Sequence, residues 1–172
     1  MNYIDTSVIV SALDPLDPRR ELARAVLEES EDNVISELVM VELASVLARR
    51  ELPEELKAKL GLREELIIPA VLLYLIRRFG LRYERVDGQM KIPILGEMYL
   101  PIATAINLSR NLRLKTLDLL HVAYARLLKD RGKPVDVLVT VDEDFERVSK
   151  IVEDRFNVKI EILKAVERHS CC

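Results

Sequence analysis

The chain has 172 residues, of which 49% are hydrophobic and 32% are charged. A chain of this size can bury about 70% of its unfolded surface, so we expect a single domain over residues 1–165 and a tail at 166–172. The 26 basic and 29 acidic residues give a net charge of −3, which excludes a disordered chain and a uniformly basic nucleic-acid-binding protein.

The first part of the chain alternates short apolar runs with helical patterns. Residues 2–5 predict a strand that leads directly into a helix. A second helix is predicted over 19–30, because its apolar residues recur at helical spacing. Residues 33–35 predict another strand, and Ser36 is suited to cap a helix that runs to about Arg50.

The segment 51–95 is less regular and begins with two helical patterns, over 53–61 and 66–79. These patterns carry more apolar residues than a peripheral segment needs: Leu56, Leu60, Leu66, Ile67, Val71, Leu72, Leu75 and Ile76. We therefore expect a homodimer, a higher oligomer or a partner protein to cover them. The alternative is that they complete the protein's own core.

A β-hairpin is predicted at the end of this segment. Two strand-like runs, 82–86 and 90–95, flank the dipeptide Asp87-Gly88. This dipeptide favours a tight turn, because both residues tolerate positive φ.

The last part of the chain alternates helices and strands again. Helices are predicted over about 97–111 and 116–131, a strand over 135–140, a helix over about 142–155 and a final strand over 158–163. Strands that alternate with helices predict a mostly parallel sheet with helices on both faces.

Several classes of protein are excluded by the remaining features. The longest apolar run, 66–76, is too short to span a bilayer, so we expect no membrane segment. Asp5 and the lack of a basic flank exclude a secretory signal, and we expect a cytoplasmic protein. Cys171 and Cys172 are adjacent, so they cannot form a Cys-x-x-Cys zinc site.

Two acidic residues follow predicted strands. Asp5 ends the first strand and Asp142 follows the strand at 135–140. Ligand sites of open parallel sheets lie at the carboxyl ends of strands. Each residue alone is also explained as a helix cap, and residues 140–143 match a capping box.

Glu42 is the only charged residue in 38–48. Its spacing to Leu38, Val41, Ser45 and Val46 predicts that it lies on the apolar face of a helix. A buried carboxylate there demands a cation, a metal or a raised pKa. The alternative is a buried ion pair with an arginine.

Asp118 is similarly the only charge in 116–125. It is alternatively explained by the dipole of a helix that Thr116 caps. His121 lies one turn later, and we interpret it as a core histidine that shares a hydrogen bond, not as a catalytic group.

The four acids become informative together, because strand ends and helices can gather them at one edge of the sheet. Hard divalent cations such as Mg²⁺ or Mn²⁺ prefer oxygen ligands, and substrate phosphate completes their coordination. The expected chemistry is metal-assisted hydrolysis of phosphodiesters.

These residues resemble the PIN-domain nucleases, and specifically the VapC-type toxin ribonucleases of toxin–antitoxin pairs. The matching segments are residues 3–9, 41–43, 117–123 and 140–145. The resemblance covers 1–50 and 97–163, whereas 51–95 is less familiar. It implies an α/β fold with a PIN-like parallel sheet of about five strands sandwiched between helices. It also implies an Mg²⁺- or Mn²⁺-dependent endoribonuclease with an antitoxin protein as partner.

The same resemblance assigns roles to individual residues. It implies that the catalytic and metal-binding acids are Asp5, Glu42, Asp118 and Asp142, with Asp144 as a second acid at the fourth position. It implies that supporting hydroxyls come from Thr6 and Thr140.

RNA binding is expected to be electrostatic, because the chain has no Trp and only 5% aromatic residues. The candidate contacts to the RNA backbone are Arg49, Arg50, Arg110, Arg113 and Lys115. The alternative is that these cations only solvate helix ends.

Other functions stay open as alternatives. They are a catalytically inactive PIN-fold interaction module and a PIN nuclease of RNA processing that has no antitoxin. An aspartyl phosphatase ranks last, because Ser7 stands where its second Asp is needed. The only histidines, His121 and His169, are too few and too far apart in sequence for a usual zinc site.

Overall fold

The computed structural model describes residues 1–30, 32–50 and 61–165. A five-stranded sheet in the order β3-β2-β1-β6-β7 forms the centre of the fold. Its strands are β1 (Asn2–Ile4), β2 (Asn33–Ile35), β3 (Arg82–Tyr83), β6 (Val137–Thr140) and β7 (Lys159–Ile162). All four pairings are parallel, so the predicted α/β fold class is confirmed.

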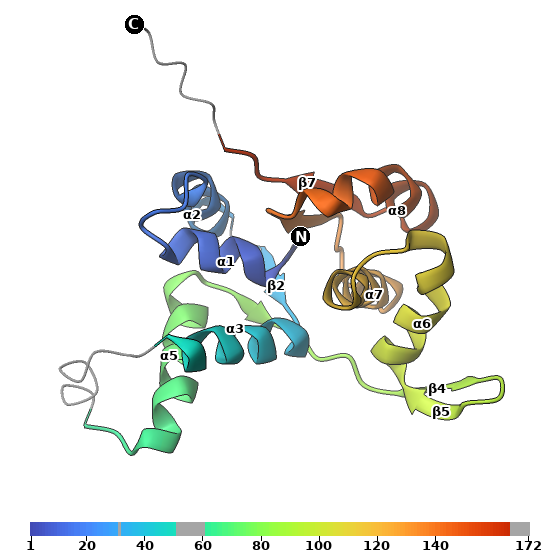
Figure 1. Cartoon of the computed structure of the whole chain (residues 1–172), viewed down its shortest axis with the longest axis horizontal. Coiled ribbons are helices and arrows are strands. Elements are labelled where there is room, and N and C mark those ends of the chain that lie inside the picture. Colours follow the sequence, from blue (N-terminus) through green and yellow to red (C-terminus); the bar gives the residue numbers. More distant parts are fainter. Residues whose placement is uncertain (31, 51–60, 166–172) are drawn as a thin grey trace, which may run out of the picture.

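Helices cover both faces of this sheet. They are α1 (Thr6–Leu13), α2 (Arg20–Glu29), α3 (Glu37–Arg49), α5 (Glu64–Arg78), α6 (Leu100–Leu112), α7 (Thr116–Asp130) and α8 (Ser149–Phe156). Figure 1 shows α1, α2, α3 and α5 on one side of the molecule and α6, α7 and α8 on the other. Right-handed crossovers produce this division, because the strand order runs in opposite directions from β1. The fold therefore has a topological switch point between β1 and β6.

The core is built around the central strand β1. Tyr3 and Ile4 are fully buried, as are Val34 of β2 and Leu138 of β6. Strands that are covered on both faces need such nearly continuous apolar runs, which is why these short runs were recognisable in the sequence.

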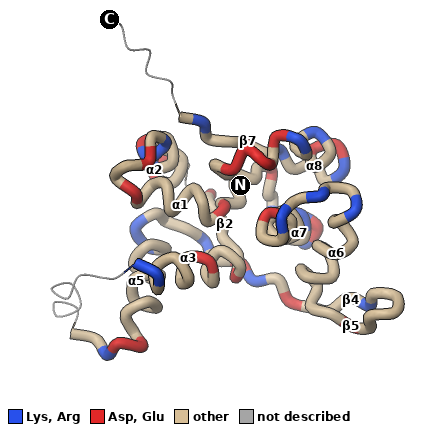
Figure 2. Tube along the Cα trace, viewed as in Figure 1, with Lys and Arg blue, Asp and Glu red and all other residues tan. Residues whose placement is uncertain are grey.

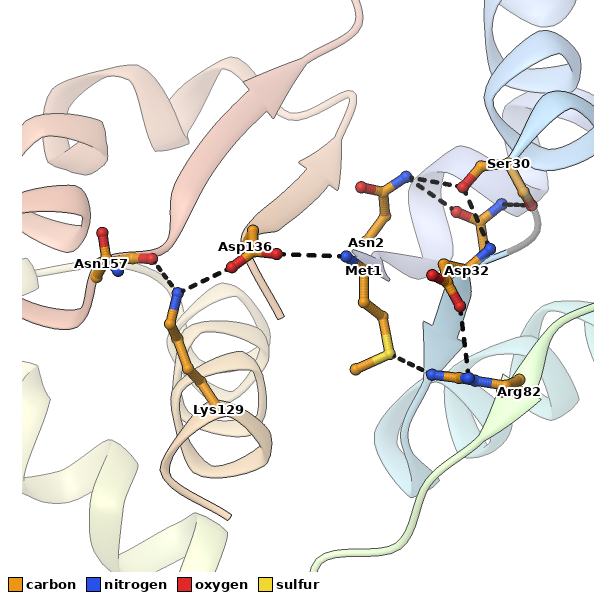
Figure 3. Close-up of polar contacts among 9 residues, drawn as sticks. Met1, Asn2, Ser30, Asp32, Arg82, Lys129, Asp136 and Asn157 are labelled. Carbon is orange, nitrogen blue, oxygen red and sulfur yellow. Dashed lines mark hydrogen bonds and ion pairs between the residues drawn. The ribbon is translucent and has the colours of Figure 1, made fainter. Parts of the chain in front are cut away.

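Polar contacts fix the start of β1 between its two neighbours (Figure 3). The amino group of Met1 lies 3.4 Å from the Asp136 carboxylate, just before β6. The Asn2 side chain donates a hydrogen bond of 3.1 Å to the side chain of Asn33, at the start of β2. Asp136 also pairs with Lys129 of α7 at 3.3 Å. The central strand is thus tied to both adjacent strands at its first residue.

The predicted hairpin is one turn out of place. The antiparallel pair is β4 (Gln89–Ile92) with β5 (Gly96–Tyr99), and the chain reverses at 93–95 instead of at Asp87-Gly88. Left-handed backbone at Ile94, with φ of 72°, and at Gly96, with φ of 85°, forms this turn.

The residues before the hairpin have other partners. Arg82–Tyr83 does not pair within a hairpin, because it joins β2 as the edge strand β3. The carbonyl of Gly88 accepts a hydrogen bond of 3.0 Å from the amide of Leu100, so this glycine holds the base of the hairpin on α6.

Several predicted helix ends also differ. The helix expected from residue 97 begins at Leu100, because β5 extends to Tyr99. The helix expected over 142–155 is a 3-10 helix (Glu143–Val148) followed by α8.

The predicted caps are wrong at three places. Asp142, and not Thr140, caps the 3-10 helix, because its Oδ1 accepts from the amide of Asp144 at 2.8 Å. Ser36 precedes α3 without a side-chain capping bond. Thr116 is the first residue of α7, so Lys115 stands at the capping position.

Helix α5 contributes to the core along part of its apolar surface. Ile67, Leu72 and Leu75 are buried, whereas Leu73 and Tyr74 are 49% and 62% exposed. The predicted helix over 53–61 lies outside the described residues except for its last position, as do both cysteines. No helix in the described part of the chain has the length and apolarity needed to cross a bilayer.

Candidate metal-binding site

A pocket of about 350 Å³ lies at the switch point, beyond the carboxyl ends of β1 and β6. Its walls come from α1, α3 and the start of α7. The lining residues include four acids and one histidine: Asp5, Glu42, Asp118, Asp142 and His121. The four acids predicted from separate segments of the sequence therefore line one pocket.

The inner part of the pocket holds Asp5, Glu42 and His121. One ligand atom of each residue lies within 4.8 Å of the other two. The Nε2 atom of His121 lies 3.2 Å from Oδ1 of Asp5 and 2.9 Å from Oε2 of Glu42. One imidazole thus bridges the two carboxylates.

A chain of polar contacts orients this imidazole. Its Nδ1 atom lies 3.1 Å from the hydroxyl of Tyr3, which lies 2.8 Å from the hydroxyl of Ser36. Burial alone would lower the pKa of His121, but the nearby Asp5 and Glu42 carboxylates outweigh burial and raise this pKa above 6.5. The histidine is thereby favoured as the cation between two acids.

Backbone and hydroxyl donors hold the two inner carboxylates. Asp5 accepts hydrogen bonds from the Ser7 amide at 3.1 Å and from the Thr140 hydroxyl at 2.5 Å. Glu42 accepts from the Thr6 hydroxyl at 2.5 Å. The structure thus brings both predicted hydroxyls into contact with predicted acids.

The outer part of the pocket is formed by Asp118, Asp142 and Asp144. One oxygen of each lies within 4.8 Å of the other two. Asp144 forms an ion pair of 2.6 Å with Lys115, which lowers the pKa of this carboxyl. The two clusters share one pocket, since Asp5 of the inner group and Asp118 of the outer group both line it.

Asp118 is the acid with the least compensation. Its Oδ2 atom is buried and accepts no hydrogen bond from the residues that the structure describes. Burial, followed by the charges of Asp142 and Asp5, raises the pKa of Asp118 to about 6. A buried carboxylate oxygen with no donor is what a bound cation would satisfy. The set of oxygen donors therefore fits Mg²⁺ or Mn²⁺, and His121 adds one nitrogen.

Two details differ from the sequence prediction. The Glu42 carboxylate is paired with His121 and not with an arginine. The buried face of α3 is formed by Val39 and Leu43, whereas Val41, expected beside Glu42 on the apolar face, is 67% exposed.

His121 is the residue whose place in the site was missed. It is a buried, hydrogen-bonded histidine as predicted, but it joins the two inner acids. A histidine in an apolar helix three residues after Asp118 was the signal in the sequence.

The predicted RNA-contacting cations lie at different distances from the pocket. Arg49 is among its lining residues, and Lys115 reaches Asp144. Arg50 pairs with Asp14 at 3.7 Å. Arg110 and Arg113 are exposed but are not among the lining residues. Basic and acidic positions are interspersed along the trace (Figure 2), so any basic surface is local.

Comparison with protein families gives one result. A family model described as the PIN domain matches residues 3–151, which include all the acids of the pocket. A comparison with curated proteins finds no match.

Proposed function

Because this chain belongs to the PIN domain family, we propose that it is an Mg²⁺- or Mn²⁺-dependent endoribonuclease that acts in the pocket between β1 and β6. Nuclease activity is general in this family. The observation that carries the proposal is the buried Asp118 Oδ2, which lacks a donor among the described residues and shares the pocket with two further acids.

In this proposal the metal ligands come from Asp5, Glu42, Asp118 and Asp142, with Asp144 at the outer rim. A divalent cation supplies Lewis acidity to a phosphodiester and to the attacking water. The chain's own residues fix the geometry. His121 and the hydroxyls of Thr6 and Thr140 hold the inner carboxylates, so these ligands lose little freedom when a cation binds.

The pocket also contains groups for the substrate. Val10, Val46 and Leu117 form apolar parts of its wall, and Arg49 stands at the same pocket. An apolar wall reduces the local dielectric, which strengthens the attraction between a cation and phosphate oxygens. Arg49 is placed to contact a neighbouring phosphate.

We further propose that the substrate is RNA and that the protein is the toxin of a toxin–antitoxin pair, acting as a homodimer or higher oligomer. Support comes from the sequence motifs around the four acids, which resemble those of VapC-type toxins. The alternatives are a PIN nuclease of RNA processing and an inactive interaction module. A neighbouring reading frame for a small protein with a DNA-binding N-terminus would favour the toxin.

The test is RNA cleavage by the purified protein with Mg²⁺, with Mn²⁺ and with EDTA. We expect cleavage only with a divalent cation, and at least about a hundredfold loss in Asp5→Asn, which keeps the shape but removes a ligand charge. Asp154→Asn on the exposed face of α8 is the matched control. Full activity of Asp5→Asn would refute the metal role, and no cleavage by the wild type with any cation would favour the inactive module.

A further inference from the structure

A second polar hollow lies between α2, α5 and the end of α1. It has a volume of about 160 Å³, and its lining includes the guanidinium-bearing residues Arg20, Arg24 and Arg78 together with Tyr74. Arg78 also borders two adjoining hollows, of about 370 and 430 Å³. Three cations thus surround one small depression on the side of the molecule that carries α2 and α5 (Figure 1).

The acids near these arginines do not use up their hydrogen-bond donors. Glu28 alone serves two guanidinium groups, since the same oxygen lies 3.3 Å from Arg24 and 2.7 Å from Arg78. Arg20 has only a 3.9 Å contact with Glu21, which is 83% exposed. Each guanidinium has five N–H donors, so three of them exceed what two carboxylates can accept.

One of these donors is buried without an acceptor. The Nε atom of Arg20 is inaccessible to solvent and has no hydrogen-bond partner within the described segments. Leaving such a donor unpaired costs about 1–3 kcal/mol, more where it belongs to a charged group. An anion in the hollow would remove this cost.

The hollow adjoins the candidate metal site along a single helix face. Val10 of α1 lines the metal pocket, and Leu13, three residues later on the same face, lines the arginine hollow. Thr6 to Leu13 spans about 10 Å of helix, so the two depressions are a few nucleotides apart along an extended strand. Arg49 lines the first pocket, and the Arg50–Asp14 pair ties the end of α3 to the end of α1.

We propose that the hollow of Arg20, Arg24 and Arg78 is a binding site for a backbone phosphate of the RNA strand whose cleavage occurs at the metal pocket. This inference rests on the proposed function, because it assigns a second contact to the same substrate. The guanidinium groups hold the phosphate by charge-assisted hydrogen bonds. The site increases affinity for strands long enough to cover both depressions.

An aromatic ring favours RNA over an acidic peptide as the occupant. Tyr74 lines the hollow and its side chain is 62% exposed. Bases stack on such rings, with about 1–3 kcal/mol for each stacked base, whereas an aspartate or glutamate chain has no group that uses the ring. Continuity with the metal pocket along α1 also fits a strand of linked phosphates.

The test measures binding of oligouridylate of about 12 nucleotides in EDTA, so that no cleavage occurs, at several salt concentrations. We expect the variant Arg20→Gln/Arg24→Gln/Arg78→Gln to bind about tenfold more weakly at low salt. The slope of log K against log salt should decrease by about 2, which is about 0.7 for each lost phosphate contact in a single strand. The corresponding triple lysine variant should keep most of the slope.

Arg126→Gln is the matched control. Arg126 lies over the ring of Phe156 and pairs with Asp130 at 3.4 Å, as Arg78 lies over Phe79 and pairs with Glu28. The control should leave affinity and slope unchanged. Thermal unfolding of every variant checks that it is folded.

The outcomes separate this inference from the proposed function. Binding that depends on the three arginines without any cleavage supports the phosphate site and removes the nuclease proposal. An unchanged slope in the glutamine variant overturns the phosphate site even when cleavage is normal, as does a wild type that binds no oligouridylate. Loss of polyaspartate binding alone in the variant identifies an acidic peptide site and also overturns it.

Discussion

The substitution Asp118→Asn is expected to stabilise the protein in the absence of metal and to abolish its activity. The pKa of this carboxyl is raised from 3.8 to about 6, mainly by burial. This change corresponds to about 3 kcal/mol against the ionised form, at about 1.36 kcal/mol per tenfold change in proton affinity. Since Asp118 is only partly buried, solvent screening reduces the gain to about 1–2 kcal/mol.

The pH dependence follows from the direction of this shift. Between about pH 4 and pH 6 the folded state holds a proton on Asp118 that the unfolded state has released, so stability falls as the pH rises through this range. The advantage of Asp118→Asn should be complete at pH 7.5 and shrink to about one third at pH 4.5. It is measured as the difference in unfolding free energy in urea with EDTA.

Metal should reverse the order of stability. Mn²⁺ at 100 times its dissociation constant stabilises the wild type by about 2.7 kcal/mol, and the variant should gain far less. Asp154→Asn, at an exposed position, should change stability by less than about 0.5 kcal/mol in either condition. A variant less stable than the wild type in EDTA at pH 7.5 would show that the Asp118 carboxylate is compensated, and the argument for a cation at this oxygen would fail.

Two further substitutions test other parts of the structure. His121→Asn should cost about 3–5 kcal/mol in urea unfolding, because it leaves two acids without their cation, and Tyr3→Phe should cost about 1 kcal/mol; an unchanged His121→Asn would disprove the bridge. The stabilisation by His121 is present below pH 6.5 and is lost as the pH rises through its raised folded-state pKa. Ile94→Asn should raise stability by about 1 kcal/mol, because Ile94 has φ of 72° and a fully exposed side chain, whereas Leu95→Asn should not; a loss of stability in Ile94→Asn would contradict the strain.

The parts of the fold that could be predicted are those that local pattern determines. The strand at Asn33–Ile35 was predicted to the residue, because an apolar run between two helical patterns has one interpretation. The hairpin was misplaced, because Asp87-Gly88 matches a turn signal while the actual turn around Ile94 carries a β-branched residue in left-handed backbone. Contacts with α6 decide that turn, and a local signal contains no information on them.

The same distinction applies to the site. Glu42 and Asp118 were recognisable because each is the only charge in an apolar segment. The bridging role of His121 was not, because its partners come from β1, from the residue after β1 and from α3. Their proximity depends on the tertiary arrangement of those elements.

The central position of β1 has a consequence for synthesis. Asn2 pairs with Val137, so the first strand waits for a partner that lies 135 residues later in the chain. At about 5–20 residues per second, translation takes roughly 7–27 s to supply it. During that time one edge of an apolar strand is open, and Asp5 has no contact with Thr140. Nascent chains should therefore be inert towards substrate and prone to wrong strand pairing until the last quarter of the polypeptide has emerged.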